Sequence, residues 1–204
     1  MSIRSILLNA EMVRAILDMR KTCTRRVIKG YIPKDAQWGY TAFTPDGCIS
    51  CRGIFKNGYG EKFFQLPCQK GDILYVRETW ADGFIGYRYR ANYIDAFKHG
   101  KKVDIKWHPS VHMPKEAARI WLKVTDVRVE RLQDIDIKGI RNEGLGSAAV
   151  HAGDMDIALE EWKILWNSTV IKSASDTYGW EANPWVWVIE FEWVNYPENE
   201  KPFV

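Results

Sequence analysis

The order of apolar and polar residues at the start of the chain predicts a strand, a helix and a second strand. Residues 2–8 (SIRSILL) are typical of a short strand. Asn9 stands where a helix N-cap is expected, and apolar residues recur at helical spacing over residues 10–19. Residues 22–28 (TCTRRVI) are β-branched and alternating, so they predict a strand that leaves the helix.

Four further segments have the pattern of strands. They cover residues 71–80, 86–93, 119–132 and 183–194. In the third of them the apolar face changes sides halfway, which predicts a β-bulge near Thr125. The last of them, NPWVWVIEFEWV, has large apolar residues at every second position and predicts a strand with one apolar face.

The other segments predict short helices, a loop and an insertion. Residues 134–144 begin with an aspartate and end in glycine, and Asp154 is placed to cap a helix that runs through Trp166. Residues 106–119 are punctuated by proline and predict a loop. Residues 30–70 are rich in glycine and aromatic residues with turn signals, so we expect one or two inserted hairpins outside the core.

These elements predict one domain over residues 1–195, followed by a polar tail over residues 196–204. The 204 residues are enough to bury a core. About six strands with short helices between them predict an α+β fold that is mainly β, arranged as a small, partly closed β-barrel.

Charge is unevenly distributed along the chain. Residues 1–29 hold seven Lys/Arg against two Asp/Glu, and residues 101–131 hold eight against four. Residues 132–204 hold five against thirteen. Two basic segments and an acidic final third predict a polarised surface, which is typical of nucleic-acid binding.

Nothing in the sequence has the pattern of a membrane span or of a secretory signal. The longest clearly apolar runs, such as residues 185–189, are far shorter than a bilayer needs. The first residues lack the apolar region and cleavage site of a signal peptide. We therefore expect a cytoplasmic protein without a membrane partner, whose four cysteines are reduced.

Residues 20–26 (RKTCTRR) interleave cations with hydroxyl groups. The segment suits either a solvated basic helix end or a site for an anionic ligand such as RNA. Its candidate ligand-binding residues are Arg20, Lys21, Thr22, Thr24, Arg25 and Arg26. Residues three apart on a strand face opposite sides, so Lys21 and Thr24 can converge only if the chain turns from helix to strand near Lys21.

The order of several motifs resembles the ASCH domain family, which has a PUA-like β-barrel fold. The motifs are RKTCTRR, GDILYVRETW, ERLQDI, a helix that ends in EG, and a final WVWVIEFE. The similarity is greatest to the branch often encoded by phages and prophages. It covers about residues 3–29, 71–93 and 106–193.

The resemblance implies RNA or a modified nucleoside as the ligand. It also implies two possible activities, that of an amidohydrolase acting on N4-acetylcytidine and that of a ribonuclease. The lysine and threonine of the amidohydrolase match Lys21 and Thr24, whereas its glutamate falls on Lys123. Glu78 is the nearest replacement, so the candidate catalytic residues are Lys21, Thr24 and Glu78.

A second wall of the site is expected around Glu78 and the 106–115 loop. Its candidate nucleic-acid contacts are Arg77, Trp80, Trp107, His112 and Lys115. Alternatives remain for two of these residues. Glu78 can form a structural ion pair with Arg25 or Arg26, and Trp80 can belong to the core. A third class of function is a protein-interaction factor that docks through its Trp-rich C-terminal strand.

The cysteine spacing argues against a metal site. Cys48 and Cys51 form a CxxC pair, but Cys23 and Cys68 do not supply the second close pair of a structural zinc site. In an extended segment the two thiols of CxxC point to opposite faces. We expect neither a metal nor a cofactor.

Overall fold

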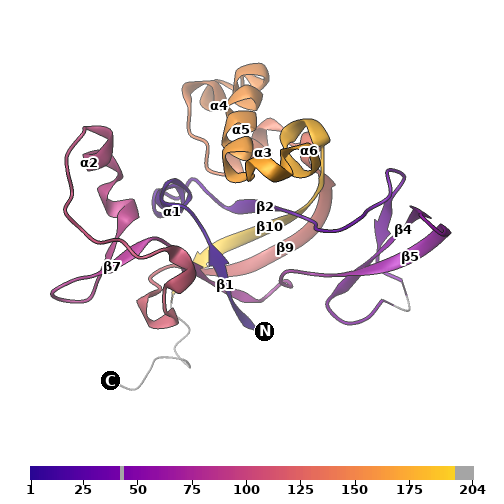
Figure 1. Ribbon diagram of the computed structural model, residues 1–204, viewed down its shortest axis with the longest axis horizontal. Helices are drawn as coiled ribbons and strands as arrows, with labels where there is room; N and C mark the ends of the chain where they lie inside the picture. The colour runs from indigo at the N-terminus through magenta and orange to yellow at the C-terminus, as the bar shows by residue number, and fades with distance from the viewer. Residues whose placement is uncertain (42–43, 196–204) are drawn as a thin grey trace.

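The computed structural model describes residues 1–41 and 44–195 and shows a mixed α+β fold (Figure 1). The predicted α+β class is confirmed, although helical residues are about as numerous as strand residues, so the fold is not mainly β. The strands are β1 (Ile3–Leu7), β2 (Cys23–Val27), β3 (Gln37–Gly39), β4 (Cys48–Phe55), β5 (Gly58–Gln65), β6 (Ile73–Arg77), β7 (Trp80–Asp82), β8 (Tyr87–Tyr89), β9 (Trp121–Arg131) and β10 (Trp185–Val194). The α-helices are α1 (Ala10–Leu17), α2 (Ile94–Lys98), α3 (Ile137–Asn142), α4 (Ala148–Ala152), α5 (Met155–Thr169) and α6 (Ser175–Tyr178).

Five strands form the main sheet, in the order β1-β6-β9-β10-β2. β1 pairs with β6 in parallel, and the other three pairings are antiparallel. Among the pairings of the described residues, β1 and β2 are the two edges and the sheet is not closed into a barrel.

The interior strand β10 is buried on both of its faces over residues 186–189. Trp187, Ile189 and Phe191 belong to the main core, whereas Val186 and Val188 pack under the helices. Figure 1 shows α3, α4, α5 and α6 together over one face of the sheet. The predicted apolar face of this strand is confirmed, and the intervening valines explain why a second layer can cover the other face.

The predicted β-bulge lies at Thr125. Glu190 pairs with Asp126 and the next residue, Phe191, pairs with Val124, so Thr125 has no partner on β10. The extra residue in β9 lets Val124 and Val127 both face the core, because a bulge shifts the alternation of side chains by one position.

Residues 30–70 form the small sheet β3-β4-β5, which confirms the predicted hairpins. The expectation that this segment lies outside the core is wrong. Ile49, Leu66 and Cys68 are buried members of the main core, and Trp38 packs against the rings of Trp185 and Trp187.

Several predicted boundaries need correction. The strand expected over residues 71–80 is divided into β6 and β7, and only residues 87–89 of the segment 86–93 are a strand. The helix predicted from residue 134 begins at Ile137, where Asp136 is the N-cap. Asp154 caps α5 as predicted, while the polar tail over residues 196–204 lies outside the described residues. No helix in the described part of the chain is long and apolar enough to cross a membrane.

Candidate functional site

The turn between α1 and β2 directs Lys21 into the protein. After α1 ends, Met19 has a positive φ of 57°, and the backbone N–H groups of Arg20 and Lys21 both donate to the carbonyl of Ala15. Lys21 then forms an isolated antiparallel bridge with Glu143 at the end of α3. The bend predicted near Lys21 is therefore present, and it buries the side chain.

Lys21 lies in a buried ion cluster with Glu143 and Arg25. The Lys21 Nζ is 2.6 Å from Glu143 Oε2 and 2.9 Å from the Glu143 carbonyl oxygen. One nitrogen of Arg25 is 3.3 Å from Glu143 Oε1, and another is 3.1 Å from Glu130 Oε2. The side chains of Lys21, Glu143 and Arg25 are 0%, 2% and 3% exposed, so both cations are neutralised within the protein.

Gly144 allows α3 to approach α1 closely enough for this cluster to form. Its φ is +99°, and an added Cβ would lie 2.7 Å from the Ala15 Cβ and 3.0 Å from the Lys21 Cβ. Only glycine avoids both the strained backbone and the contact. The EG pair that ends the helix therefore has a direct role in placing Glu143.

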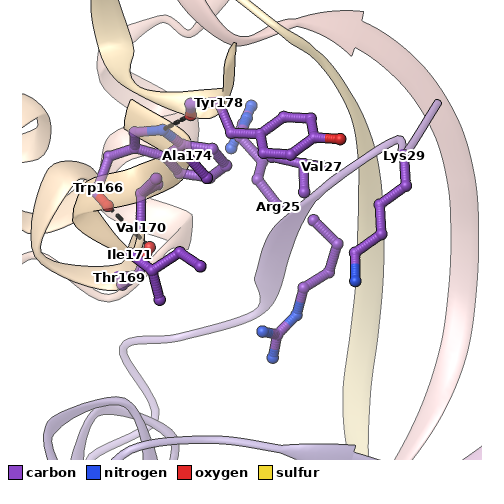
Figure 2. A pocket seen from close by; sticks show the side chains of 10 residues that line it. Arg25, Val27, Lys29, Trp166, Thr169, Val170, Ile171, Ala174 and Tyr178 are labelled. Atoms are coloured by element: carbon purple, nitrogen blue, oxygen red, sulfur yellow. Dashed lines mark hydrogen bonds between the residues drawn. The ribbon is translucent and has the colours of Figure 1, made fainter. Parts of the chain in front are cut away.

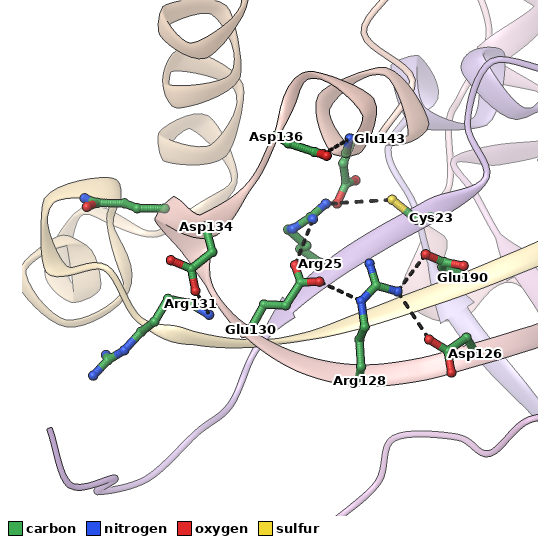
Figure 3. A network of polar contacts seen from close by, with 12 residues as sticks. Cys23, Arg25, Asp126, Arg128, Glu130, Arg131, Asp134, Asp136, Glu143 and Glu190 are labelled. Atoms are coloured by element: carbon green, nitrogen blue, oxygen red, sulfur yellow. Dashed lines mark hydrogen bonds and ion pairs between the residues drawn. The ribbon is translucent and has the colours of Figure 1, made fainter. Parts of the chain in front are cut away.

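A second set of charges continues the network across β9 and β10 (Figure 3). Arg128 donates to Glu130 and Glu190, and it also pairs with Asp126. Burial acts to lower the pKa of Arg128, but hydrogen bonds to Glu130 and Glu190 raise it above its usual range. Arg128, Glu130 and Glu190 line a polar pocket of about 270 Å³ that holds both cations and carboxylates.

Cys23 lies in this polar pocket but is not a reactive thiol. Burial, and next the charge of Glu143, raise its pKa to about 12. The thiol is therefore protonated at neutral pH, and the thiolate is the nucleophilic form.

A cleft of about 340 Å³ lies between the β2 segment and the end of α5 through α6 (Figure 2). One wall comes from β2 and the residues after it, and the other from the end of α5 through α6. The lining residues are Arg25, Arg26, Val27, Lys29, Trp166, Thr169, Val170, Ile171, Ala174 and Tyr178. A smaller cavity of about 40 Å³ shares Arg25, Arg26, Trp166 and Thr169 with the cleft and is also lined by Thr24 and Glu143.

Two polar groups beside this cavity lack protein partners. Thr24 is 2% exposed, and its hydroxyl makes no hydrogen bond to another described residue. The buried Nε of Arg25 likewise has no acceptor within residues 1–41 and 44–195. Buried polar groups are normally hydrogen-bonded, so both groups are suited to a ligand or an ordered water.

The mouth of the cleft carries two further cations. Arg26 donates to the carbonyl of Leu7, 2.6 Å away, so it links the edge strands β2 and β1. Burial lowers the pKa of Arg26, and Glu143 acts in the opposite direction. Lys29 is exposed and forms no ion pair with any residue that the structure describes.

The predicted role of Glu78 is not supported by its position. Its carboxylate is 1% exposed and accepts two hydrogen bonds from Arg119, at 2.8 and 3.1 Å. The expected ion pair of Glu78 with Arg25 or Arg26 is therefore wrong. Burial raises the pKa of Glu78, and the hydrogen bond and charge of Arg119 oppose this rise. Lys123 is half exposed and pairs with Glu192.

The other candidate contacts do not line the cleft. Arg20 donates to the Gly144 carbonyl and to Asp18, while Thr22 is exposed. The second group surrounds the 106–115 loop. Arg77 donates to the carbonyls of Met113 and Val111, Trp80 packs on Met113, Trp107 contacts Tyr93, Lys115 lies over Trp121, and His112 is exposed. The predicted pair of facing walls is thus not formed.

Sequence reasoning missed Glu143, Glu130 and the wall formed by Trp166 and Tyr178. A signal for Glu143 was present, because the helix ending in EG is one of the motifs that carry the resemblance. No comparable signal linked Trp166 or Tyr178 to residues 20–26, since only the packing of α5 and α6 on β2 joins them.

Within the described ranges, no group of three or more His, Cys, Asp or Glu is placed to hold a metal ion. Cys23, Cys48, Cys51 and Cys68 are free cysteines. No protein-family model, no curated protein and no solved structure matches this chain.

Proposed function

We propose that this protein is an ASCH-type domain that binds a nucleoside, free or within RNA, in the cleft between β2 and the α5–α6 segment. The observation that carries the proposal is a cleft with an aromatic and apolar wall, two cations at its mouth, and Arg25, whose buried Nε has no acceptor among the described residues. A volume of about 340 Å³ lies within the range of small-molecule sites.

The lining suits the chemistry of a nucleoside. Trp166 and Tyr178 provide aromatic surface, and the Trp166 indole N–H is fixed by the Tyr178 carbonyl at 2.9 Å. Arg25 Nε can bond to a polar edge of a base or sugar, and Lys29 can meet a phosphate at the mouth. The Thr24 hydroxyl lies in the adjoining small cavity. The contact of Arg26 with Leu7 joins the two edge strands and supports the finer proposal of a partly closed, PUA-like barrel.

The binding proposal is tested with nucleosides and their 5′-monophosphates by isothermal titration calorimetry. Tyr178→Ala should weaken binding of both ligand forms, because it removes part of the wall. Lys29→Ala should weaken binding of the monophosphate alone, and Lys34→Ala is the matched control because Lys34 is also exposed but lies outside the cleft. Absence of any nucleoside or nucleotide binding by the native protein would refute the proposal.

A second candidate function, an amidohydrolase, is favoured by one observation. The unpartnered hydroxyl of Thr24 and the carboxylate of Glu143, which holds Lys21, line the same cavity. Glu143 thus supplies the carboxylate that Glu78 does not. In this reaction the Thr24 oxygen would bond to the acyl carbon of the amide, and its proton would pass to the Lys21–Glu143 pair. The pair would return the proton to the leaving amine as the C–N bond breaks, and water would then hydrolyse the acyl ester.

Turnover of N4-acetylcytidine tests this second candidate. Thr24→Val keeps the shape of the side chain and should abolish turnover, whereas Glu78→Gln should leave it unchanged because Glu78 lies outside the cleft. If the native protein binds the nucleoside but releases no acetate, the binding function stands and the hydrolase does not.

A further inference from the structure

Residues 80–108, which we call the arm, project from one side of the main sheet (Figure 1). The arm contains the hairpin β7–β8 and helix α2, and it is held at its base by Trp80, which packs against Met113 and Ala117. An isolated antiparallel bridge between Trp80 and His108 returns the chain alongside β7. The arm is therefore anchored at its base and leaves its tip free.

The tip of the arm presents two large apolar side chains to solvent. Phe84 is 98% exposed and Ile85 is 90% exposed. The turn beneath them is tight, because the Gly83 N–H donates to the Gly86 carbonyl at 2.9 Å and an added Cβ on Gly83 would lie 2.9 Å from that oxygen. A short turn of this kind directs the two side chains outward, so the rest of the arm does not cover them.

Exposed cations lie on β8 and along the segment that returns from α2 to the base of the arm (Figure 1). They are Arg88 on β8 and Lys98, Lys101, Lys102 and Lys106 in and after α2. None of the five forms an ion pair with a residue in the described part of the chain. Because His108 bridges Trp80 in an antiparallel sense, Lys106 lies beside β7 in the direction of the tip.

We propose that the arm binds single-stranded nucleic acid, with Phe84 stacking on a base and the lysines meeting the phosphates. Aromatic side chains among cations are the usual means of holding a single strand. The choice of nucleic acid as the ligand rests on the proposed function. If the arm and the cleft both bind, the preferred ligand of the whole protein is a polynucleotide. The alternative ligand, an anionic membrane surface, is separated from nucleic acid by the test below.

The arm is tested by fluorescence anisotropy with a labelled 12-nucleotide oligouridylate at several salt concentrations. Phe84→Ala should weaken binding about 5- to 160-fold, which is the range for loss of one base stack. Lys101→Ala with Lys102→Ala should reduce the slope of log K against log salt by about 1.4 if each lysine neutralises one phosphate. Ile164→Ala is the control, since Ile164 is 70% exposed on α5, outside the arm.

The outcomes separate the arm from the cleft. If the native protein does not bind the oligonucleotide, or Phe84→Ala binds it as tightly as the native protein, the arm proposal is overturned while nucleoside binding in the cleft can still hold. If the oligonucleotide binds through Phe84 but no nucleoside enters the cleft, the arm stands and the proposed function fails. If the protein sediments with phosphatidylserine vesicles in a Phe84-dependent manner but does not bind RNA, the arm proposal is overturned and the ligand of the arm is a membrane surface.

Discussion

Replacing Glu143 with glutamine removes the one carboxylate that Lys21 contacts. In the native protein this carboxylate also faces Arg25, and all three side chains are 3% exposed or less. Glutamine keeps the shape of the side chain and one acceptor oxygen, and the carbonyl of residue 143 still accepts from Lys21. The substitution therefore removes the negative charge with little change in shape. It leaves Lys21 without a counterion and Arg25 paired with Glu130 alone.

The expected cost is large because buried Lys21 then has no counterion, and Arg25 keeps only the partly exposed carboxylate of Glu130. Removing one partner of a buried ion pair lowers the free energy of unfolding by about 3–5 kcal/mol. Glu143→Gln keeps two acceptors for Lys21, so we expect a loss near the lower end, about 3 kcal/mol. For a protein of this size that loss corresponds to a fall in Tm of roughly 6–12 °C. Urea unfolding followed by tryptophan fluorescence measures it directly.

A double-mutant cycle distinguishes this cause from a general packing defect. Lys21→Met in the Glu143→Gln background removes the stranded cation and leaves Arg25 paired with Glu130. It should recover at least about 1 kcal/mol relative to Glu143→Gln alone, because neighbouring charges couple strongly. A loss below about 1 kcal/mol for Glu143→Gln, or additive effects of the two changes, would refute the buried cluster as described.

Two other predictions follow from the packing. Arg119→Met strands the buried carboxylate of Glu78 and should cost about 3 kcal/mol at neutral pH. Burial already raises the pKa of Glu78, and loss of Arg119 raises it further. The loss of stability relative to the native protein should therefore be smallest below about pH 4.5 and grow as the pH rises towards the folded-state pKa; equal losses in chemical denaturation at pH 4 and pH 7 would contradict this. Gly144→Ala should lower the free energy of unfolding by about 2–4 kcal/mol, through backbone strain and contact with Ala15. Gly30→Ala, at a φ of +106° but with no neighbour within 4 Å, should lower it by about 1 kcal/mol. Similar losses in the two variants would show that the contact with Ala15 is unimportant.

The local elements could be predicted because each depends on residues close in sequence. The cap of α1 by Asn9, the cap of α5 by Asp154 and the bulge at Thr125 all follow from side-chain type and alternation. The boundary at Arg77 could not be found in this way. The strand-like pattern continues through residue 80, but β6 ends at Arg77 and the next residue, Glu78, is buried against Arg119, which lies 41 positions away.

The candidate site was predicted only in part for the same physical reason. The positions of Lys21 and Thr24 near a turn follow from the local pattern. The partners of the cations do not, because Glu143 and Glu130 lie more than 100 positions away from Arg25. A count of charges over residues 20–26 therefore predicted an accessible basic wall, whereas the fold neutralises most of it.

Each cation of residues 20–26 has a partner within the protein, and this limits which ligands the cleft can select. Arg20 and Arg26 donate to the carbonyls of Gly144 and Leu7, and Lys21 and Arg25 are balanced by carboxylates. Lys29 is the cation at the cleft mouth with no partner among the described residues. Recognition in the cleft must then depend on shape and hydrogen bonds more than on phosphate charge. Binding of a mononucleotide in the cleft should accordingly release about one counterion. The steeper salt dependence expected for a longer strand would then come from the cations of the arm.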